Sequence, residues 1–199
     1  IKKDIAILKK LNVEYLFTPK ARDIYKFKAK KFNLKKKDKI LCARYRSGHF
    51  EGVLNVMNRL MTIIRSKDLF MGEKDYQQLY LIKKFIKKKF NVKVVSCKTV
   101  RDVNKIALSS RNILLNKNDL KKSSFISKEL IKLKNKLKVN FFYKYQISDL
   151  MKKINNIKNI KIDYLEIRNK KNLSKKFNKN NFKIFVAYYN NNIRLIDNY

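Results

Sequence analysis

The chain has 199 residues, 45% of them apolar, which suits one large or two small globular domains; no apolar run approaches the roughly 20 residues that span a bilayer. Two distant cysteines and one histidine exclude a disulfide framework of more than one bridge and argue against a zinc site, and this usage favours a reducing cytoplasm. The 51 basic residues outnumber the 15 acidic ones, for a net charge of +36, which is compatible with binding to nucleic acid through its phosphates.

The first part of the chain carries weak signals. Residues 2–11 have the apolar spacing of an amphipathic helix, and residues 13–17 form an apolar run that we expect to be a buried strand. Pro19 ends that run, and residues 20–25 are expected to form one helical turn. The basic stretch 26–39 is poorly patterned, and we expect an irregular strand and loop there. Because the chain begins with Ile rather than Met, we expect it to be a piece of a longer product.

Residues 50–97 alternate between the helical and the strand pattern. Residues 50–65 show the clearest helical spacing, and 68–71 read as a short strand. A second helix is expected at 74–89 and another strand at 92–97. This alternation predicts an α/β domain with a parallel sheet.

The second half has a different pattern. Helices are expected near 118–137 and 146–155. Three strands are expected after them, at residues 160–167, 182–189 and 193–196. The last two strands are separated by three asparagines, and Asn tolerates the positive φ of a tight hairpin. We therefore expect an α+β unit with an antiparallel sheet, and we place the boundary between domains 1–99 and 100–199.

The three glycines fall within two short segments, residues 46–52 and 72–78, which suggests backbone positions with unusual dihedrals or close approach. Gly72 ends a strand and opens a helix, whose free N–H groups form a site for anions. Lys74 in the first turn opposes the helix dipole, and a bound phosphate would offset that cost. The alternative is a solvated lysine beside two favourable acids.

Two further segments carry candidate ligand-binding groups. Ser109, Ser110 and Arg111 place two hydroxyls beside a guanidinium, a set that can hold a polyphosphate. The alternative is a serine helix cap with a surface arginine. Arg46 and His49 lie at the entrance to the helix at 50–65 and could bind an anion; the alternative there is a capped helix with a half-buried histidine.

Taken together, these segments resemble the pantothenate synthetase family in order and spacing. Residues 46–53 read Arg-Ser-Gly-His-Phe-Glu-Gly-Val, and residues 70–79 read Phe-Met-Gly-Glu-Lys-Asp-Tyr-Gln-Gln-Leu. Thr-Val-Arg-Asp follows at 99–102, and Ala-Leu-Ser-Ser-Arg-Asn at 107–112. The resemblance extends over the whole chain, through strings at residues 13–19, 163–166 and 194–198. Ser47 is a departure, since the family usually has Pro there.

The resemblance implies a Rossmann-like nucleotidyltransferase domain, incomplete at its N-terminus, followed by a small α+β lid domain. The family joins pantoate to β-alanine. The pantoate carboxylate attacks the α-phosphate of ATP to give pantoyl adenylate and pyrophosphate, and the β-alanine amine then displaces AMP. Magnesium accompanies the ATP. Family members are usually homodimers, and the resemblance implies no specific nucleic-acid partner and no membrane.

The resemblance also implies roles for residues of this chain. Lys74, Ser109, Ser110 and Arg111 would be the catalytic residues, holding the ATP phosphates from two sides. The ATP site implied by the family motifs comprises Gly72, Glu73, Lys74, Asp75, Val100, Leu108, Ser109, Ser110 and Arg111. Gln78 would bind pantoate, with Arg46 and His49 as further candidates. Asp75 lies by the ribose or the metal, and no other side chain is expected to bind the metal.

Two family motifs are absent from these 199 residues. One is a Met-Gly-Ala-Leu-His-x-Gly-His-like segment, and the other an Asn-Pro-x-Gln-Phe segment that supplies a second pantoate-binding glutamine. We therefore expect this polypeptide alone to be inactive. Two alternatives remain: a basic nucleic-acid-binding domain, or an inactive remnant of the ligase. The even spread of lysines over all segments favours codon bias in an AT-rich genome over a nucleic-acid function.

Overall fold

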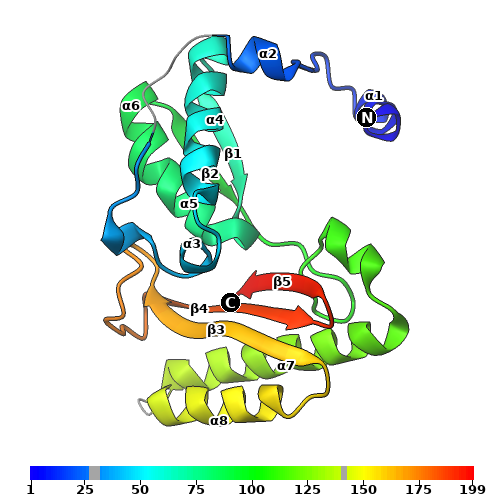
Figure 1. Cartoon of the computed structure of the whole chain (residues 1–199), viewed down its shortest axis with the longest axis vertical. Helices are drawn as coiled ribbons and strands as arrows, with labels where there is room; N and C mark the ends of the chain where they lie inside the picture. Colours follow the sequence, from blue (N-terminus) through cyan, green and yellow to red (C-terminus); the bar gives the residue numbers. More distant parts are fainter. Residues whose placement is uncertain (27–31, 140–142) are drawn as a thin grey trace.

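The chain forms two sheets, each with its own helices (Figure 1). The computed structural model describes residues 1–26, 32–139 and 143–199. Within these ranges, a two-stranded parallel sheet lies in the first half and a three-stranded antiparallel sheet in the second. The expected change from α/β to α+β organisation is thereby confirmed, whereas the boundary at residue 99 stays a prediction.

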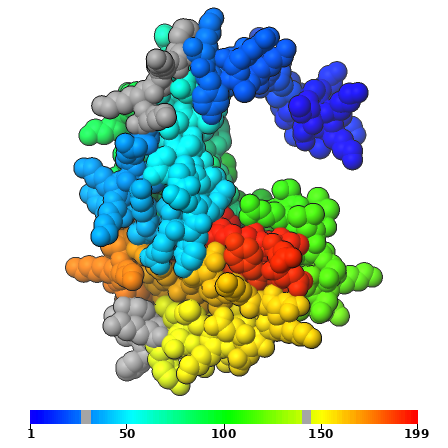
Figure 2. Space-filling view, in the orientation of Figure 1, coloured from blue at the N-terminus to red at the C-terminus, as the bar shows by residue number. Residues whose placement is uncertain are grey.

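The N-terminal arm, residues 1–26, stands apart from the rest of the molecule at its first helix (Figures 1 and 2) and contacts it at its end, where the Arg59 guanidinium donates to the Ile24 carbonyl at 3.3 Å. It contains α1 (Lys2–Lys10) and the single turn α2 (Ala21–Ile24), as expected. The strand expected at residues 13–17 is wrong, because this run is extended but pairs with no described strand, and its Tyr15 is 88% exposed. A strand needs a neighbour to satisfy its backbone groups, and local apolar composition cannot supply one.

The basic stretch 26–39 is only partly described, since residues 27–31 lie outside the described ranges. Its described remainder contains the 3₁₀ turn η1 (Lys36–Asp38) and no strand. The short helix α3 (Cys42–Tyr45) follows. A loop with the one positive-φ glycine, Gly48 at φ 74°, then leads into α4 (His49–Ile64).

The parallel sheet consists of β1 (Asp68–Gly72) and β2 (Lys93–Cys97), paired in register from Asp68 opposite Lys93 to Gly72 opposite Cys97. Between them the chain forms the 3₁₀ turn η2 (Glu73–Asp75) and a continuous helical stretch. That stretch consists of α5 (Tyr76–Ile82), the π turn η3 (Lys83–Lys87) and α6 (Lys88–Phe90). The carboxyl ends of both strands therefore lie at one edge, where open α/β sheets bind their ligands.

The antiparallel sheet has the order β3 (Ile160–Asn169), β4 (Phe182–Asn190), β5 (Ile193–Asn198). The expected hairpin between β4 and β5 is confirmed, with Asn190 paired to Ile193 and Asn191 at φ 51°. Before the sheet come the 3₁₀ helix η4 (Ser110–Leu114) and the helices α7 (Lys117–Val139) and α8 (Tyr143–Asn155). None of the described helices has the length and apolar character needed to cross a membrane.

Strand β4 is buried on both faces and thereby joins the two halves. Ile184 and Val186 pack in the cluster with α7 and α8, whereas the alternate residues Phe185 and Ala187 pack in the cluster with α4 and α5. Figure 1 shows the same arrangement, with α7 and α8 on one side of this sheet and α3 and α5 on the other. Because strand side chains alternate with period two, one strand can serve two cores.

We predict that Leu130→Ala lowers the free energy of unfolding by about 2–5 kcal/mol, because it leaves a cavity between α7 and the antiparallel sheet. Leu130 is fully buried in the cluster that includes Ile154 and Ile184. Urea denaturation followed by circular dichroism measures the loss. Lys128→Ala on the exposed side of the same helix is the control and should change stability by less than about 0.5 kcal/mol. Equal losses would contradict the assigned core.

Candidate active site

Two neighbouring clefts share Lys74 as a lining residue. The first, which we call the Gln78 cleft, is lined by Arg46, His49, Lys74, Asp75 and Gln78 together with the end of β5. The second, the Arg111 cleft, is lined by Lys74, Ser109 and Arg111 together with the same strand. The predicted pantoate residues and part of the predicted phosphate residues therefore lie on either side of one lysine.

Lys74 reaches this position because β1 ends at Gly72 and the chain turns through η2 before α5 begins. Among the described residues, its ammonium group makes no ion pair and no hydrogen bond, while its backbone carbonyl accepts a bond from Asn198. The Lys74 side chain is thus available to an anionic ligand. The backbone of Lys74 is held by Asn198, which lies at the end of β5 in the antiparallel sheet.

The two consecutive glutamines of α5 differ in their hydrogen-bond partners. Gln77 is 6% exposed and holds the segment before α3, donating to the carbonyls of Asp38 and Ile40 and accepting from the amide of Ala43. Gln78 lines the cleft. Adjacent residues on a helix point about 100° apart, and although both glutamines border the cleft, the Gln77 amide is already bonded whereas Gln78 makes no hydrogen bond to the described residues. Sequence reasoning assigned a role to Gln78 and missed the structural role of Gln77.

His49 lies among charges from several segments. Its ring packs edge-on against Phe50, with centroids 5.0 Å apart. Partial burial lowers the pKa of His49 below its usual 6.5, and the nearby charges of Arg46, Arg111 and Arg194 lower it further, whereas Asp75 acts in the opposite direction. The imidazole is therefore neutral at pH 7 in an electropositive cleft.

The Ser109–Arg111 segment begins the 3₁₀ helix η4. The Ser109 hydroxyl accepts a 3.2 Å bond from the Arg111 amide, so the expected alternative of a serine cap is realised. The Arg111 guanidinium donates to the carbonyl of Arg194 at 2.9 Å and remains exposed. Ser109 and Arg111 line the Arg111 cleft, and the exposed Ser110 does not.

Some predicted site residues lie outside both clefts. Val100 is 64% exposed and Leu108 53% exposed, and the Leu108 amide donates to the Val100 carbonyl at 3.0 Å. Glu73 faces away, with its carboxylate 3.7 Å from the Lys183 ammonium. Gly72 has an ordinary φ of −67° and no atom close to where a Cβ would lie, so the expectation of unusual backbone at the glycines holds only for Gly48.

Sequence reasoning gave no role to several residues that line the clefts. Cys42 is buried, with its sulfur 3.0 Å from the Tyr164 hydroxyl and 3.6 Å from the Arg194 guanidinium. Arg194 in turn pairs with Asp163 at 2.8 Å. Burial raises the pKa of Tyr164, so this hydroxyl stays protonated. The available signals were the strings at residues 163–166 and 194–198, which resembled the family but had been given no role.

Asp197 lines both clefts, yet its carboxylate is already occupied. Both of its oxygens accept bonds from the Arg101 guanidinium, at 2.7 and 2.8 Å, and the Tyr199 hydroxyl donates to one of them. No three His, Cys, Asp or Glu side chains in the described ranges lie close enough to hold a metal ion. Asp75 is exposed and is the remaining acidic side chain of the Gln78 cleft.

Comparisons with known proteins agree on one family. The model of the family described as pantoate-beta-alanine ligase matches residues 1–199. The bifunctional pantoate ligase/cytidylate kinase of Prochlorococcus marinus is 38% identical over 203 residues, which cover 99% of this chain and 39% of that protein. The chain thus spans well under half of that relative.

Solved structures show the same likeness. Pantothenate synthetase from Thermus thermophilus superposes with a TM-score of 0.89 and 27% identity, covering 100% of this chain and 73% of that one. The pantoate-beta-alanine ligase of Francisella tularensis, solved with Beta-gamma ATP and β-alanine, gives a TM-score of 0.78 and 34% identity over 100% of this chain and 69% of that one.

We predict that the single histidine of the chain titrates below pH 6.5, as measured from the His49 ring protons by NMR. Its folded pKa lies below the unfolded value, so the unfolded state binds the proton more tightly. The contribution of His49 to stability is therefore fully present above pH 6.5. It is lost as the pH falls from 6.5 through the lower pKa of the folded state. Arg46→Gln should raise the pKa of His49 by removing a positive charge; a wild-type pKa at or above 6.5 would contradict the assigned surroundings.

Proposed function

This chain belongs to the pantoate–β-alanine ligase family, and we propose that it acts in the ATP-dependent condensation of pantoate with β-alanine to pantothenate. The observation that carries the proposal is the position of Lys74, which is shared by the Gln78 cleft and the Arg111 cleft. A reaction between a carboxylate and a nucleotide phosphate needs both groups beside one cation. The Francisella relative, solved with Beta-gamma ATP and β-alanine, supports the same class of substrates.

The proposed reaction has two steps. A pantoate carboxylate oxygen attacks the α-phosphorus of ATP, and the bond to the bridging oxygen breaks, giving pantoyl adenylate and pyrophosphate. The uncharged amine of β-alanine then attacks the acyl carbon, AMP leaves, and the amine loses a proton to form the amide. The attacking groups come from the substrates, so the protein contributes positioning and charge stabilisation.

The residues of the clefts suit these tasks. The Lys74 ammonium stabilises the negative charge that builds up on the transferring phosphoryl group. Arg111 holds the phosphates from the lid side and balances the charge of the departing pyrophosphate. Ser109, whose hydroxyl accepts from the Arg111 amide, and Ser110 stand beside it in the same segment. Gln78 donates a hydrogen bond to pantoate, and the neutral His49 with Arg46 completes that side of the cleft. The backbone of Val100 contacts the adenine, and Leu108 belongs to the same ATP site.

Magnesium belongs to this proposal as the partner of the ATP phosphates. The described residues offer no cluster of acidic side chains to hold it, so the ion would be bound mainly by phosphate oxygens, with Asp75 as the nearest exposed carboxylate. A homodimer and a cytoplasmic location are further expectations carried by family membership.

We predict that the 199-residue polypeptide by itself does not turn over. It contains neither the histidine-bearing family segment nor the second pantoate-binding glutamine, so only one side of the ATP and pantoate sites is present. The test is pyrophosphate release with ATP, Mg²⁺, pantoate and β-alanine, with the Thermus relative assayed as the active control. Sustained formation of pyrophosphate and pantothenate by this polypeptide would refute the expected inactivity.

We predict that Lys74→Ala weakens ATP binding about tenfold to a hundredfold, the range expected for loss of one charge-assisted hydrogen bond. Equilibrium dialysis with labelled ATP measures the affinity. Lys88→Ala is the matched control, because it removes the same charge from an exposed position in α6 that lines neither cleft. Both variants remove one positive charge, so they reduce the nonspecific attraction between ATP and this chain of net charge +36 by the same amount. Equal weakening with a steep salt dependence would instead favour the nucleic-acid-binding alternative.

A further inference from the structure

Asn198, at the end of β5, contacts the turn that carries Lys74. Its side-chain amide donates to the Glu73 carbonyl at 2.8 Å and to the Lys74 carbonyl at 2.9 Å. Its side-chain oxygen accepts from the Lys183 ammonium at 2.8 Å, and the residue is 3% exposed. We propose that Asn198 is a positioning residue that sets the place of the Lys74 side chain from the antiparallel sheet, an inference that rests on the proposed role of Lys74.

The amide of Asn198 is fully used in this arrangement. An asparagine has two N–H donors and one carbonyl acceptor, and all three functions are engaged with η2 and β4. An aspartate of the same shape has no donor for the two carbonyls. Leaving the buried amide donors without partners would cost free energy. The two hydrogen bonds of Asn198 therefore favour the arrangement in which η2 stays beside β5.

Asn198 is itself held firmly. Its backbone amide donates to the Asp197 carboxylate at 2.7 Å, and its backbone carbonyl accepts from the Arg101 guanidinium at 3.0 Å. Arg101 forms the bidentate pair with Asp197. The asparagine side chain therefore projects from a backbone that is fixed on both sides. Such support is what a positioning residue requires, because a loosely held residue cannot place another.

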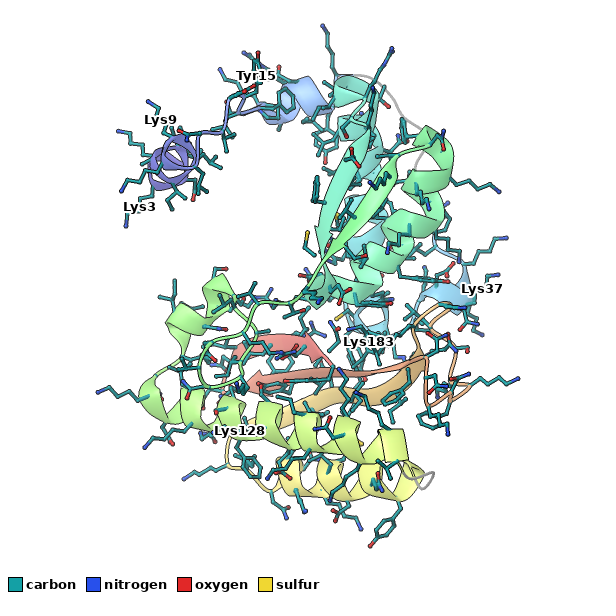
Figure 3. All side chains as sticks on the ribbon, turned by 180° about the vertical axis from the view of Figure 1, so that it is seen from behind. Lys3, Lys9, Tyr15, Lys37, Lys128 and Lys183 are labelled. Carbon is teal, nitrogen blue, oxygen red and sulfur yellow. The ribbon has the colours of Figure 1, made fainter. Side chains whose placement is uncertain are left out.

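A second contact reinforces the first. The Lys183 ammonium that donates to Asn198 also lies 3.7 Å from the Glu73 carboxylate and 5.0 Å from the centre of the Tyr76 ring. Figure 3 shows Lys183 at the junction of the two halves. Glu73, which precedes Lys74, and Tyr76, which follows the turn, are thus both in contact with Lys183 of β4.

This arrangement has a mechanical consequence. Lys74 follows β1 in the sequence, yet its carbonyl is bonded to a residue 124 positions later in the chain. The Lys74 turn is therefore attached to both sheets. A displacement of β5 relative to β1 must either carry Lys74 along or break the two amide bonds.

The test compares Asn198→Asp with Asn190→Asp in the whole chain. Asn190 is a matched control: it is fully buried on the neighbouring strand, and its amide also donates two bonds, to the Asp119 carbonyl at 2.8 Å and the Ser123 hydroxyl at 3.0 Å. Those bonds go to α7 rather than to the Lys74 turn. Asn198→Ala is added because it removes the donor without adding a negative charge that would repel ATP.

The first readout is amide hydrogen exchange of residues 73–78, which needs no ligand. We expect exchange about tenfold faster in both Asn198 variants and unchanged in Asn190→Asp. The second readout is ATP affinity well below the melting temperature, with about tenfold weakening expected in the Asn198 variants only. If Asn198 served only to accept from Lys183, Asn198→Asp would behave like the wild type, and the proposal would be overturned.

Two further outcomes are informative. If the Asn198 variants do not fold, the test is amide hydrogen exchange of the wild type under native conditions. The amides of residues 73–78 should then exchange in the same opening event as those of β5. Exchange of residues 73–78 before β5 opens would overturn the proposal. If the wild type binds no ATP, the proposed contact of Lys74 with the ATP phosphates fails for this polypeptide, while the exchange of residues 73–78 still tests the positioning role by itself.

Discussion

The bidentate ion pair between Arg101 and Asp197 is the contact on which the junction of the two halves depends. Charge-assisted pairs of this geometry are strong, and removing one partner of a mostly buried pair leaves an uncompensated charge. Arg101 belongs to the connection between the sheets and Asp197 to the last strand, so the pair joins the connection to β5. The fixed strand end then presents Asn198 to the turn that carries Lys74.

The antiparallel sheet contributes more than a lid surface to this junction. Because β4 is buried on both faces, the same strand packs with α7 and α8 through Ile184 and Val186 and with the first half through Phe185 and Ala187. The ring of Phe185 lies against Tyr76, the first residue of α5. Apolar packing brings the Lys74 turn near β5, and the directional hydrogen bonds of Asn198 then define its position.

Several acidic residues of this basic chain form ion pairs where the two halves meet. Glu166 pairs with Arg44, Asp163 with Arg194, and Glu73 with Lys183, each between or beside the two sheets. In the clefts themselves, Arg46, Lys74 and Arg111 outnumber the exposed carboxylate of Asp75, because Asp197 is paired with Arg101. A high positive charge with scarce acids is thus compatible with a specific fold, because the acids present neutralise the arginines and lysines that would otherwise be buried without partners. The remaining cations leave an electropositive cleft suited to phosphates.

The sequence by itself determined the elements whose signals are local. The helical spacing of residues 50–65, the strand that ends at Gly72 and the Asn hairpin all appear as expected. The motifs that resemble the ligase family contain Lys74, Gln78, Ser109 and Arg111, which line the two clefts.

Only the tertiary structure decided the features that depend on a neighbour. The run at 13–17 has the composition of a strand but pairs with no described strand. Gln77 and Gln78 are the same residue type, and only packing determines that the amide of Gln77 is bonded to the segment around α3 while Gln78 remains without a hydrogen bond to the described residues at the cleft. The position of the Lys74 turn is set by Asn198, far along the chain, because hydrogen bonds and burial depend on distance in space, which local propensity does not encode.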